Sequence, residues 1–321
     1  MKKHVLTAAA LICVLATLSL CSCTNAGTPT TGSPTETAAP ETTASAINTS
    51  GTETAVPTEQ STPVPTENTG AAGTETGTAD AVVYDIRLSD SGVDLGESGA
   101  ALEGKVIKIT KAGSYRFTGA LSDGEIVVAV SKEETVDLIL AGVSITNKDG
   151  PAIWCDSADK LYVTTEENTV NTLSDGKNYA LPDGPNATLY SDDDLTVRGT
   201  GTLTVMGRFK NGISSKNDIK IKELTLNVES YNTGVRGKGS VTVTSGNIEI
   251  NAGNDGIKST DDTTKGKGFV EITGGKIVIT AGDDGIQAAT VLTVSGGSVQ
   301  INAEGKKVNA PEQNITEGTV R

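Results

Sequence analysis

A repeat of about 22 residues constrains this chain more than any other feature of its sequence. The segments AGNDGIKS (252–259) and AGDDGIQA (281–288) are nearly identical. The apolar residue after each turn glycine recurs at intervals of 22, 22, 29 and 22 residues, at Ile213, Val235, Ile257, Ile286 and Val308. The longer interval holds an insertion near TDDTTKG. A repeat of 20 to 50 residues is typical of a solenoid.

Each repeat contains three short β-branched segments joined by turns with glycine, as in DGIQA, TVLTVSG and GSVQINA. No window has sustained helical periodicity, so the sequence predicts an all-β fold. A second apolar column runs through Leu138, Leu161, Leu195, Ile219, Val241, Val270 and Leu292. Three strands per unit predict a parallel β-helix of about 22 residues per coil, with neighbouring coils about 4.8 Å apart.

The N-terminal part predicts export. Residues 1–22 have a basic tip, an apolar run and small residues, which is typical of a secretory signal. The segment LCSC resembles a lipobox, so we expect cleavage after Ser22 and lipid on Cys23, with simple secretion as the alternative. Residues 23–81 are rich in Thr, Pro and Glu and predict a disordered tether. The folded domain is then 82–321, on an extracellular lipoprotein that contacts the membrane only through its lipid.

The composition excludes several chemistries. The only histidine is His4, inside the predicted signal, so the mature chain has no Ser-His-Asp or Cys-His pair and no histidine-liganded zinc. Cys155 would be the only cysteine of the folded domain, so an intramolecular disulfide is not expected. The net charge of −14 argues against nucleic acid as a partner.

Several segments carry a family resemblance over residues 82–310, among them GPAIWCDSADKLYVTTEENTVNTLSDG, YSDDDLTVRGTGTLTV, NGISSKNDIKI and the repeated NDGIKS and DDGIQA units. They resemble a family of clostridial cell-surface carbohydrate-binding proteins. The resemblance implies a right-handed parallel β-helix similar in shape to pectate lyases. It also implies bound calcium and the binding of cellulose and acidic plant polysaccharide.

The turn before the apolar column predicts a first acidic column, formed by Asn254, Asp255, Asp283 and Asp284. Neighbouring coils would hold these carboxylates about 5 Å apart, which is unfavourable for unscreened like charges. Ca²⁺ binds six to eight oxygen ligands and would relieve this repulsion. Asp-Gly and Asn-Asp are also good turn formers, so a purely structural role stays open.

A second acidic column follows the same strands, at Asp192, Asp193, Asp194, Asn217, Asp218, Asp261 and Asp262. Three consecutive aspartates are more than a turn requires, and we therefore expect Ca²⁺ as a cofactor here as well. Neither column has the spacing of an EF-hand loop, and Mg²⁺ prefers fewer protein ligands.

Carbohydrate contacts are predicted beside the first column. Arg236, Lys258 and Gln287 alternate with inward residues and should form an outward ladder on one sheet. Tyr231 is the predicted stacking residue, with Trp154 and Tyr190 among the other available aromatic side chains.

These patterns favour a monomeric, calcium-dependent binding module for plant cell-wall polysaccharide, either acidic pectin-type or cellulose, without catalytic residues. Two alternatives stay open. One is a calcium-dependent polysaccharide lyase, which would need a base such as Lys258, Lys216 or Arg236. The other is a surface adhesin with a protein ligand.

Overall fold

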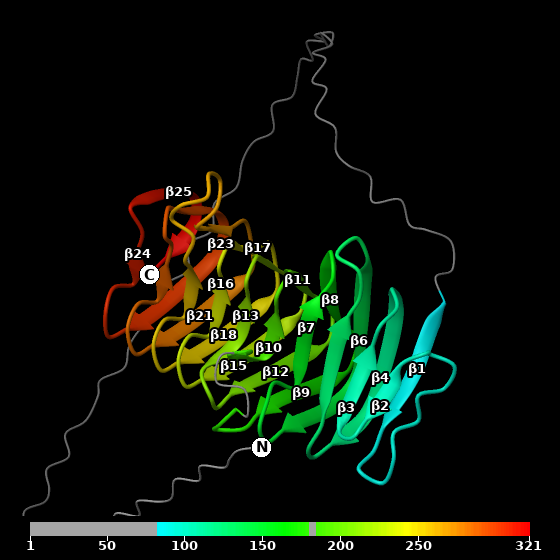
Figure 1. Cartoon of the computed structure of the whole chain (residues 1–321). Helices are drawn as coiled ribbons and strands as arrows, with labels where there is room; N and C mark the ends of the chain where they lie inside the picture. The colour runs from blue at the N-terminus through cyan, green and yellow to red at the C-terminus, as the bar shows by residue number, and fades with distance from the viewer. Residues whose placement is uncertain (1–81, 180–183) are drawn as a thin grey trace, which may run out of the picture. The chain divides into compact units, whose positions relative to one another are not determined.

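The computed structural model describes residues 82–179 and 184–321, which belong to one compact unit, Gly73–Arg321. The predicted signal (1–22), the lipid attachment at Cys23 and the tether (23–81) lie outside the described residues. The all-β prediction is confirmed, because the described segments are strands joined by turns (Figure 1). Among them, no helix has the length and apolar character that crossing a membrane requires.

The strands follow the chain in short succession. Their bounds are β1 Val83–Leu88, β2 Ala101–Glu103, β3 Val106–Ile109, β4 Gly113–Leu121, β5 Glu125–Ala129, β6 Thr135–Asn147, β7 Ile153–Ser157, β8 Lys160–Thr165, β9 Val170–Asp175, β10 Ala187–Ser191, β11 Asp194–Gly199, β12 Thr202–Gly207, β13 Asn211–Ser215, β14 Asp218–Lys222, β15 Thr225–Ser230, β16 Val235–Gly237, β17 Ser240–Val243, β18 Asn247–Ala252, β19 Ile257–Ser259, β20 Phe269–Ile272, β21 Lys276–Ala281, β22 Ile286–Gln287, β23 Val291–Ala303, β24 Val308–Asn309 and β25 Glu312–Val320.

The sequence repeat appears in the structure as parallel strand pairing. The first apolar column is in register along β13, β16, β19, β22 and β24, with each member opposite the next. The second column is likewise paired from Leu161 to Leu292. Its first predicted member is wrong, because Val136 lies opposite Leu161 and Leu138 lies opposite Val163.

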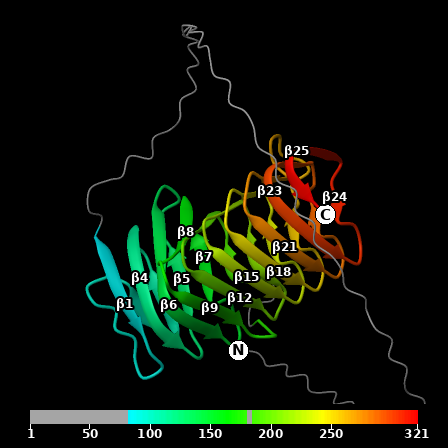
Figure 2. The ribbon, with the colours of Figure 1, turned by 180° about the vertical axis from the view of Figure 1, so that it is seen from behind.

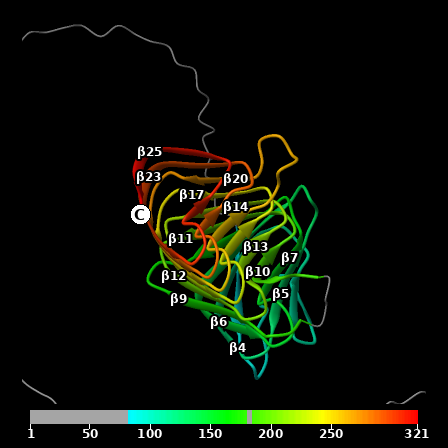
Figure 3. The same ribbon diagram turned by 90° about the vertical axis from the view of Figure 1, so that its left-hand side faces the viewer.

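The main sheet corrects the predicted architecture. Twelve described strands pair in a closed ring, in the order β6-β8-β11-β14-β17-β20-β23-β21-β18-β15-β12-β9 and back to β6. β1 and β4 extend this sheet beyond β6, and β25 pairs with β23. Figure 3 shows β9 and β12, two strands of this ring, apart from β10 and β13, which belong to a second sheet. The prediction of an open right-handed parallel β-helix is therefore wrong.

Two long strands close the ring. β6 and β23 have 13 residues each, and each pairs through its first half with one part of the sheet and through its second half with the other. Glycines at positive φ sit within both strands, Gly142 at 85° and Gly297 at 80°. Such values are accessible to glycine at little cost, so the chain bends there while remaining a strand. The predicted turn between the segments TVLTVSG and GSVQINA is therefore wrong, because both segments belong to β23.

The core lies inside the strands and is built from the inward residues of every repeat. Ile, Val and Leu side chains fill it, and Phe117 and Tyr115 on β4 are its bulkiest members. Figure 2 shows β4 beside β1 at the N-terminal end of the strands. The turn before β19 needs a glycine for space. A Cβ at Gly256 would lie 2.3 Å from Ile279 Cγ2 and 2.5 Å from the Gly285 carbonyl oxygen. These glycines let the turns stack closely and thereby fix the edge of the second sheet.

Candidate functional site

The second sheet has ten strands, in the order β2-β3-β5-β7-β10-β13-β16-β19-β22-β24, and its middle strands lie side by side in Figure 1. Between its inward apolar columns, one residue from each strand faces outward, because side chains alternate along a strand. We call this set the outward row. It consists of Lys108, Val127, Trp154, Tyr190, Ser214, Arg236, Lys258, Gln287 and Asn309. The predicted Arg236, Lys258 and Gln287 are consecutive members of it.

This face concentrates buried polar atoms that the described chain leaves without a partner. Five side-chain atoms have neither a hydrogen bond nor an ion pair there: Glu125 Oε1, Trp154 Nε1, Ser214 Oγ, Asp255 Oδ1 and Gln287 Oε1. A sixth atom without a hydrogen bond, Asp192 Oδ1, lies 2.7 Å from the ammonium of Lys216.

All five atoms belong to the ten-stranded sheet or to a turn at its edge. Trp154, Ser214 and Gln287 are members of the outward row, Glu125 begins β5, and Asp255 lies in the turn before β19. A buried polar group without a partner costs about 1–3 kcal/mol. Their gathering on one face indicates a surface whose polar groups are completed by something other than this chain.

The aromatic part of the outward row is largely covered. Trp154 and Tyr190 are register partners on β7 and β10, and Tyr190 is only 4% exposed. Burial raises the pKa of the Tyr190 phenol. Lys216 Nζ lies 6.0 Å from the centre of its ring and binds Asp192. This part of the row therefore offers ring edges and polar tips rather than an open stacking surface.

The first acidic column converges. Single carboxylate oxygens of Asp255, Asp283 and Asp284 all lie within 4.8 Å of one another. Asp255 is fully buried, and its Oδ2 accepts hydrogen bonds from Lys258 Nζ at 2.7 Å and from Asn254 Nδ2 at 3.1 Å. Its Oδ1 has no partner among the described residues. Three carboxylates from adjacent turns, one with a free buried oxygen, match the hard oxygen ligands that Ca²⁺ prefers.

Asp283 and Asp284 differ in how far the chain already uses them. Asp284 is buried, and it accepts hydrogen bonds from the Lys306 amide at 2.8 Å and from Asn309 Nδ2 at 2.6 Å. Asp283 is exposed. A cation would thus meet the open carboxylate of Asp283, the buried Oδ1 of Asp255 and the carboxylate of Asp284, which its neighbours already orient.

The second acidic column does not converge in the same way, because its members bind donors of the chain. Asp193 accepts from Lys132 Nζ at 2.8 Å and from the Ala158 amide at 3.0 Å. Asp218 accepts from Lys267 Nζ at 2.5 Å. Asp261 caps the inserted loop through backbone amides, and Asp192 pairs with Lys216. Two further members also contact the chain. Asp194 accepts a hydrogen bond from the Asp218 amide, and the Asn217 amide donates one to Ser215 Oγ. Asp262 is exposed.

Sequence reasoning missed Glu125, which lies at the start of β5 beside a group of charged residues. Burial raises the pKa of its carboxyl to about 7, Lys105 opposes this effect, and Asp149 adds to it. Lys105 itself is held by Asp123 at 2.9 Å and by Asp149. A lone glutamate before the apolar run IVVAV carries no local signal of burial, so only the fold could identify it.

Tyr231 lies apart from the other predicted carbohydrate contacts. It directly follows β15, whereas Arg236, Lys258 and Gln287 belong to strands of the ten-stranded sheet. Its side chain is 75% exposed, and it lines a separate pocket together with Lys177 and Arg208. Neither of those two cations was a sequence candidate.

Comparisons with known proteins bear on this face. A carbohydrate-binding domain-containing protein of Acetivibrio thermocellus is 38% identical over 165 residues, which are 50% of this chain and 56% of that protein. This chain thus spans about half the length of the curated relative that it matches. A solved structure described as the polysaccharide lyase-like protein from C. thermocellum, gadolinium derivative, is 38% identical with a TM-score of 0.72. The match covers 74% of this chain and all of that one.

The family described as carbohydrate-binding domain-containing protein matches residues 103–320. This match includes the whole outward row and both acidic columns. The chain belongs to the family of carbohydrate-binding domain-containing proteins.

Proposed function

We propose that this chain is a monomeric binding module that holds plant cell-wall polysaccharide against the outward row. The observation that carries the proposal is the run of partly exposed polar side chains Arg236, Lys258 and Gln287 on the adjacent strands β16, β19 and β22. Sugar hydroxyls both donate and accept hydrogen bonds, so one polymer can satisfy an indole N–H and an amide oxygen alike.

The row also sets how the polymer lies. Neighbouring members are one strand apart, about 4.8 Å, so a ligand that contacts Trp154 and Gln287 together must run across the strands. Arg236 lies between them, and the hydrogen bond recorded for its guanidinium is a long one, 3.4 Å from Nη2 to Thr260 Oγ1. Its remaining donors match the carboxylate of an acidic, pectin-type sugar, whereas the hydroxyl partners match cellulose equally well.

Calcium is the proposed cofactor, and Asp255, Asp283 and Asp284 are the residues that would hold it. When bound, Ca²⁺ supplies positive charge and open coordination positions beside Gln287, where a sugar carboxylate could join. The support for this site is the convergence of three carboxylates, one of which has a buried oxygen without a partner among the described residues. Lys258 competes for the same position through its 2.7 Å contact with Asp255 Oδ2.

Binding is favoured over lyase chemistry by the state of the candidate bases. A lyase base must accept a proton and therefore needs a neutral amine near working pH. Asp192 forms an ion pair with Lys216 at 2.7 Å, and this contact raises the pKa of the ammonium. Lys258 is paired with the buried Asp255. Both lysines can bind carboxylates as cations. We further propose that lipid on Cys23 holds the module at the cell surface.

Retention of the whole chain on immobilised polygalacturonate and on cellulose tests this function, with Ca²⁺ and with chelator. We expect retention in Ca²⁺ and a clear loss in the variants Arg236→Gln and Gln287→Ala. Lys111→Gln, which changes an exposed lysine outside the row and far along the chain from Arg236 and Gln287, is the matched control. Equal retention of all variants would exclude the outward row. Ultraviolet absorbance that grows with time would reveal an unsaturated product and establish the lyase alternative.

A further inference from the structure

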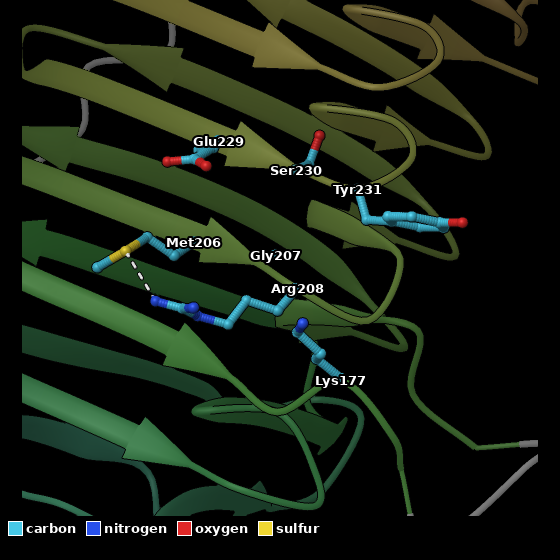
Figure 4. A pocket seen from close by; sticks show the side chains of 7 residues that line it. All are labelled: Lys177, Met206, Gly207, Arg208, Glu229, Ser230 and Tyr231. Carbon is cyan, nitrogen blue, oxygen red and sulfur yellow. Dashed lines mark hydrogen bonds between the residues drawn. The ribbon is translucent and has the colours of Figure 1, made fainter. Parts of the chain in front are cut away.

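A second pocket lies outside the outward row, at the ends of β12 and β15 (Figure 4). Met206 and Glu229 are register partners on these two strands, so the pocket lies across the gap between neighbouring repeats. Its volume is about 240 Å³. Sites for drug-sized ligands span about 300–1,000 Å³, so this one suits a single sugar residue of a longer chain.

The pocket carries positive charge that no ion pair among the described residues neutralises. Arg208 Nε donates to Ser174 Oγ at 3.2 Å, and its Nη2 lies 3.7 Å from Met206 Sδ. Neither partner is charged. Within residues 82–179 and 184–321, no carboxylate forms an ion pair with Arg208 or with Lys177. Two free cations in a chain of net charge −14 mark this pocket as a place for an anionic group.

One acid also lines the pocket, and it does not cancel this charge. Glu229 is exposed and lies on β15, whereas Arg208 follows β12. Figure 4 shows the Arg208 side chain extended toward Met206, with Lys177 near its base and Glu229 across the pocket. Two cations against one carboxylate leave a net positive lining, and Glu229 can still accept a hydrogen bond from a sugar hydroxyl.

Hydrogen bonds to Asp175 hold the turn that carries Arg208. Asp175 is buried, its Oδ1 accepts the Arg208 backbone N–H at 2.5 Å, and its Oδ2 accepts the Tyr179 hydroxyl at 2.7 Å. The Tyr179 ring stacks on Phe209 at a centroid distance of 4.2 Å. The backbone of Arg208 therefore does not have to be ordered by a ligand, which lowers the entropic cost of binding.

Tyr231 supplies an apolar face beside the charges. Its backbone N–H donates to the Gly207 carbonyl at 2.7 Å, which fixes the residue on the pocket rim while its ring stays 75% exposed. Figure 4 shows the Tyr231 ring pointing away from the Arg208 guanidinium, so the ring can contact the C–H face of one sugar while the fork of the guanidinium binds the carboxylate of the neighbouring sugar through two hydrogen bonds.

We infer that this pocket is a metal-independent subsite for a uronate residue, with the uronate carboxylate on Arg208 and Lys177 and the neighbouring sugar ring of the polymer against Tyr231. The inference rests on the proposed function in that the ligand is part of a polysaccharide. It places carboxylate recognition on a different face from the calcium-dependent outward row.

Calorimetric titration of the whole chain with short oligosaccharides, in the presence of chelator, tests the inference. The probes are trimers of galacturonate and of mannuronate, with a neutral galactose trimer as the reference. We expect at least one uronate trimer to bind about tenfold or more tightly than the neutral one, since a bidentate carboxylate contact contributes that much. Which uronate binds identifies the class of polymer.

Variants locate the binding. Arg208→Gln and Lys177→Gln should each weaken uronate binding by about tenfold, whereas Lys111→Gln removes the same charge elsewhere and should leave it unchanged. Tyr231→Ala should weaken it and Tyr231→Phe should retain it. If Arg208→Gln folds poorly, Lys177→Gln and the two Tyr231 variants still test whether uronate binds in this pocket.

Two results would overturn the inference: no preference for either uronate trimer in wild type, or uronate affinity unchanged by Arg208→Gln and Lys177→Gln. Failure of the proposed function looks different. In that case polymer retention in Ca²⁺ would survive Arg236→Gln and Gln287→Ala, whatever the trimers do.

Discussion

Replacing Glu125 by glutamine should make the stability of this protein less dependent on pH. Burial raises the pKa of the Glu125 carboxyl from 4.5 to about 7 in the folded chain, with Lys105 and Asp149 as the nearby charges. The folded state therefore holds this proton more tightly than the unfolded state. Its contribution to stability is fully present below pH 4.5 and is lost as the pH rises through about 7.

The size of the effect follows from the difference between the two pKa values. Each pKa unit corresponds to about 1.4 kcal/mol, so a change from 4.5 to about 7 costs the wild type on the order of 3 kcal/mol above pH 8. Glutamine has nearly the same shape and no charge to bury. We expect Glu125→Gln to gain stability relative to wild type between pH 5 and pH 8 by an amount of this order.

Urea unfolding at several pH values measures this difference directly. The exposed Glu304→Gln removes one carboxylate at the far end of the repeats and serves as the control. A free energy of unfolding for Glu125→Gln that runs parallel to wild type across this pH range would refute the reasoning. It would mean that Glu125 is ionised in the folded state without cost, for instance through water or a cation that meets its Oε1.

Three further outcomes are expected, two from the structure and one, at Cys23, from the sequence alone. Ca²⁺ at one hundred times its dissociation constant should stabilise the folded wild type by about 2.7 kcal/mol and so raise its melting temperature. Asp255→Asn should reduce this rise, and Asp261→Asn should keep it. An equal rise in both variants would exclude the converging cluster as the site. Ile257→Ala should lower the free energy of unfolding in urea by about 2–5 kcal/mol, because the Ile257 side chain is fully buried. The control Lys265→Ala changes an exposed residue and should alter this free energy by less than about 0.5 kcal/mol. Similar values for both variants would contradict the stacked core. Cys23→Ala should move the protein from the membrane fraction to the medium or leave the signal uncleaved, and a cleaved, membrane-bound variant would disprove lipid attachment at this cysteine.

The sequence predicted how the 22-residue repeats stack on one another. Val235 and Ile257 stack because a 22-residue repeat with an inward β-branched residue after a turn glycine has few other ways to bury it. The same logic placed Arg236, Lys258 and Gln287 in one row. Closure of the main sheet was missed because it depends on β6 and β23, where glycine bends a strand without ending it. In the sequence a glycine that bends a strand and one that ends it are indistinguishable.

The sites were predictable only where the repeat is regular. Between Leu161 and Leu195 the interval lengthens to 34 residues, so the register that places Trp154 beside Tyr190 could not be extrapolated. Lys177 lies in this irregular part, so its place in one pocket with Arg208 and Tyr231 could not be predicted from the repeat. The burial of Glu125 likewise arises from contacts distant in sequence, which local patterns do not contain.

The stacked glycine turns have a consequence for how such a surface changes in evolution. Duplicating one 22-residue unit between β14 and β19 would preserve the stacking on both sides and would leave the two long strands at the ends untouched. The outward row would then grow by one position, about 4.8 Å, at each duplication. Ligand length can therefore be altered in discrete steps by gene duplication, without redesigning the core or the ends of the domain.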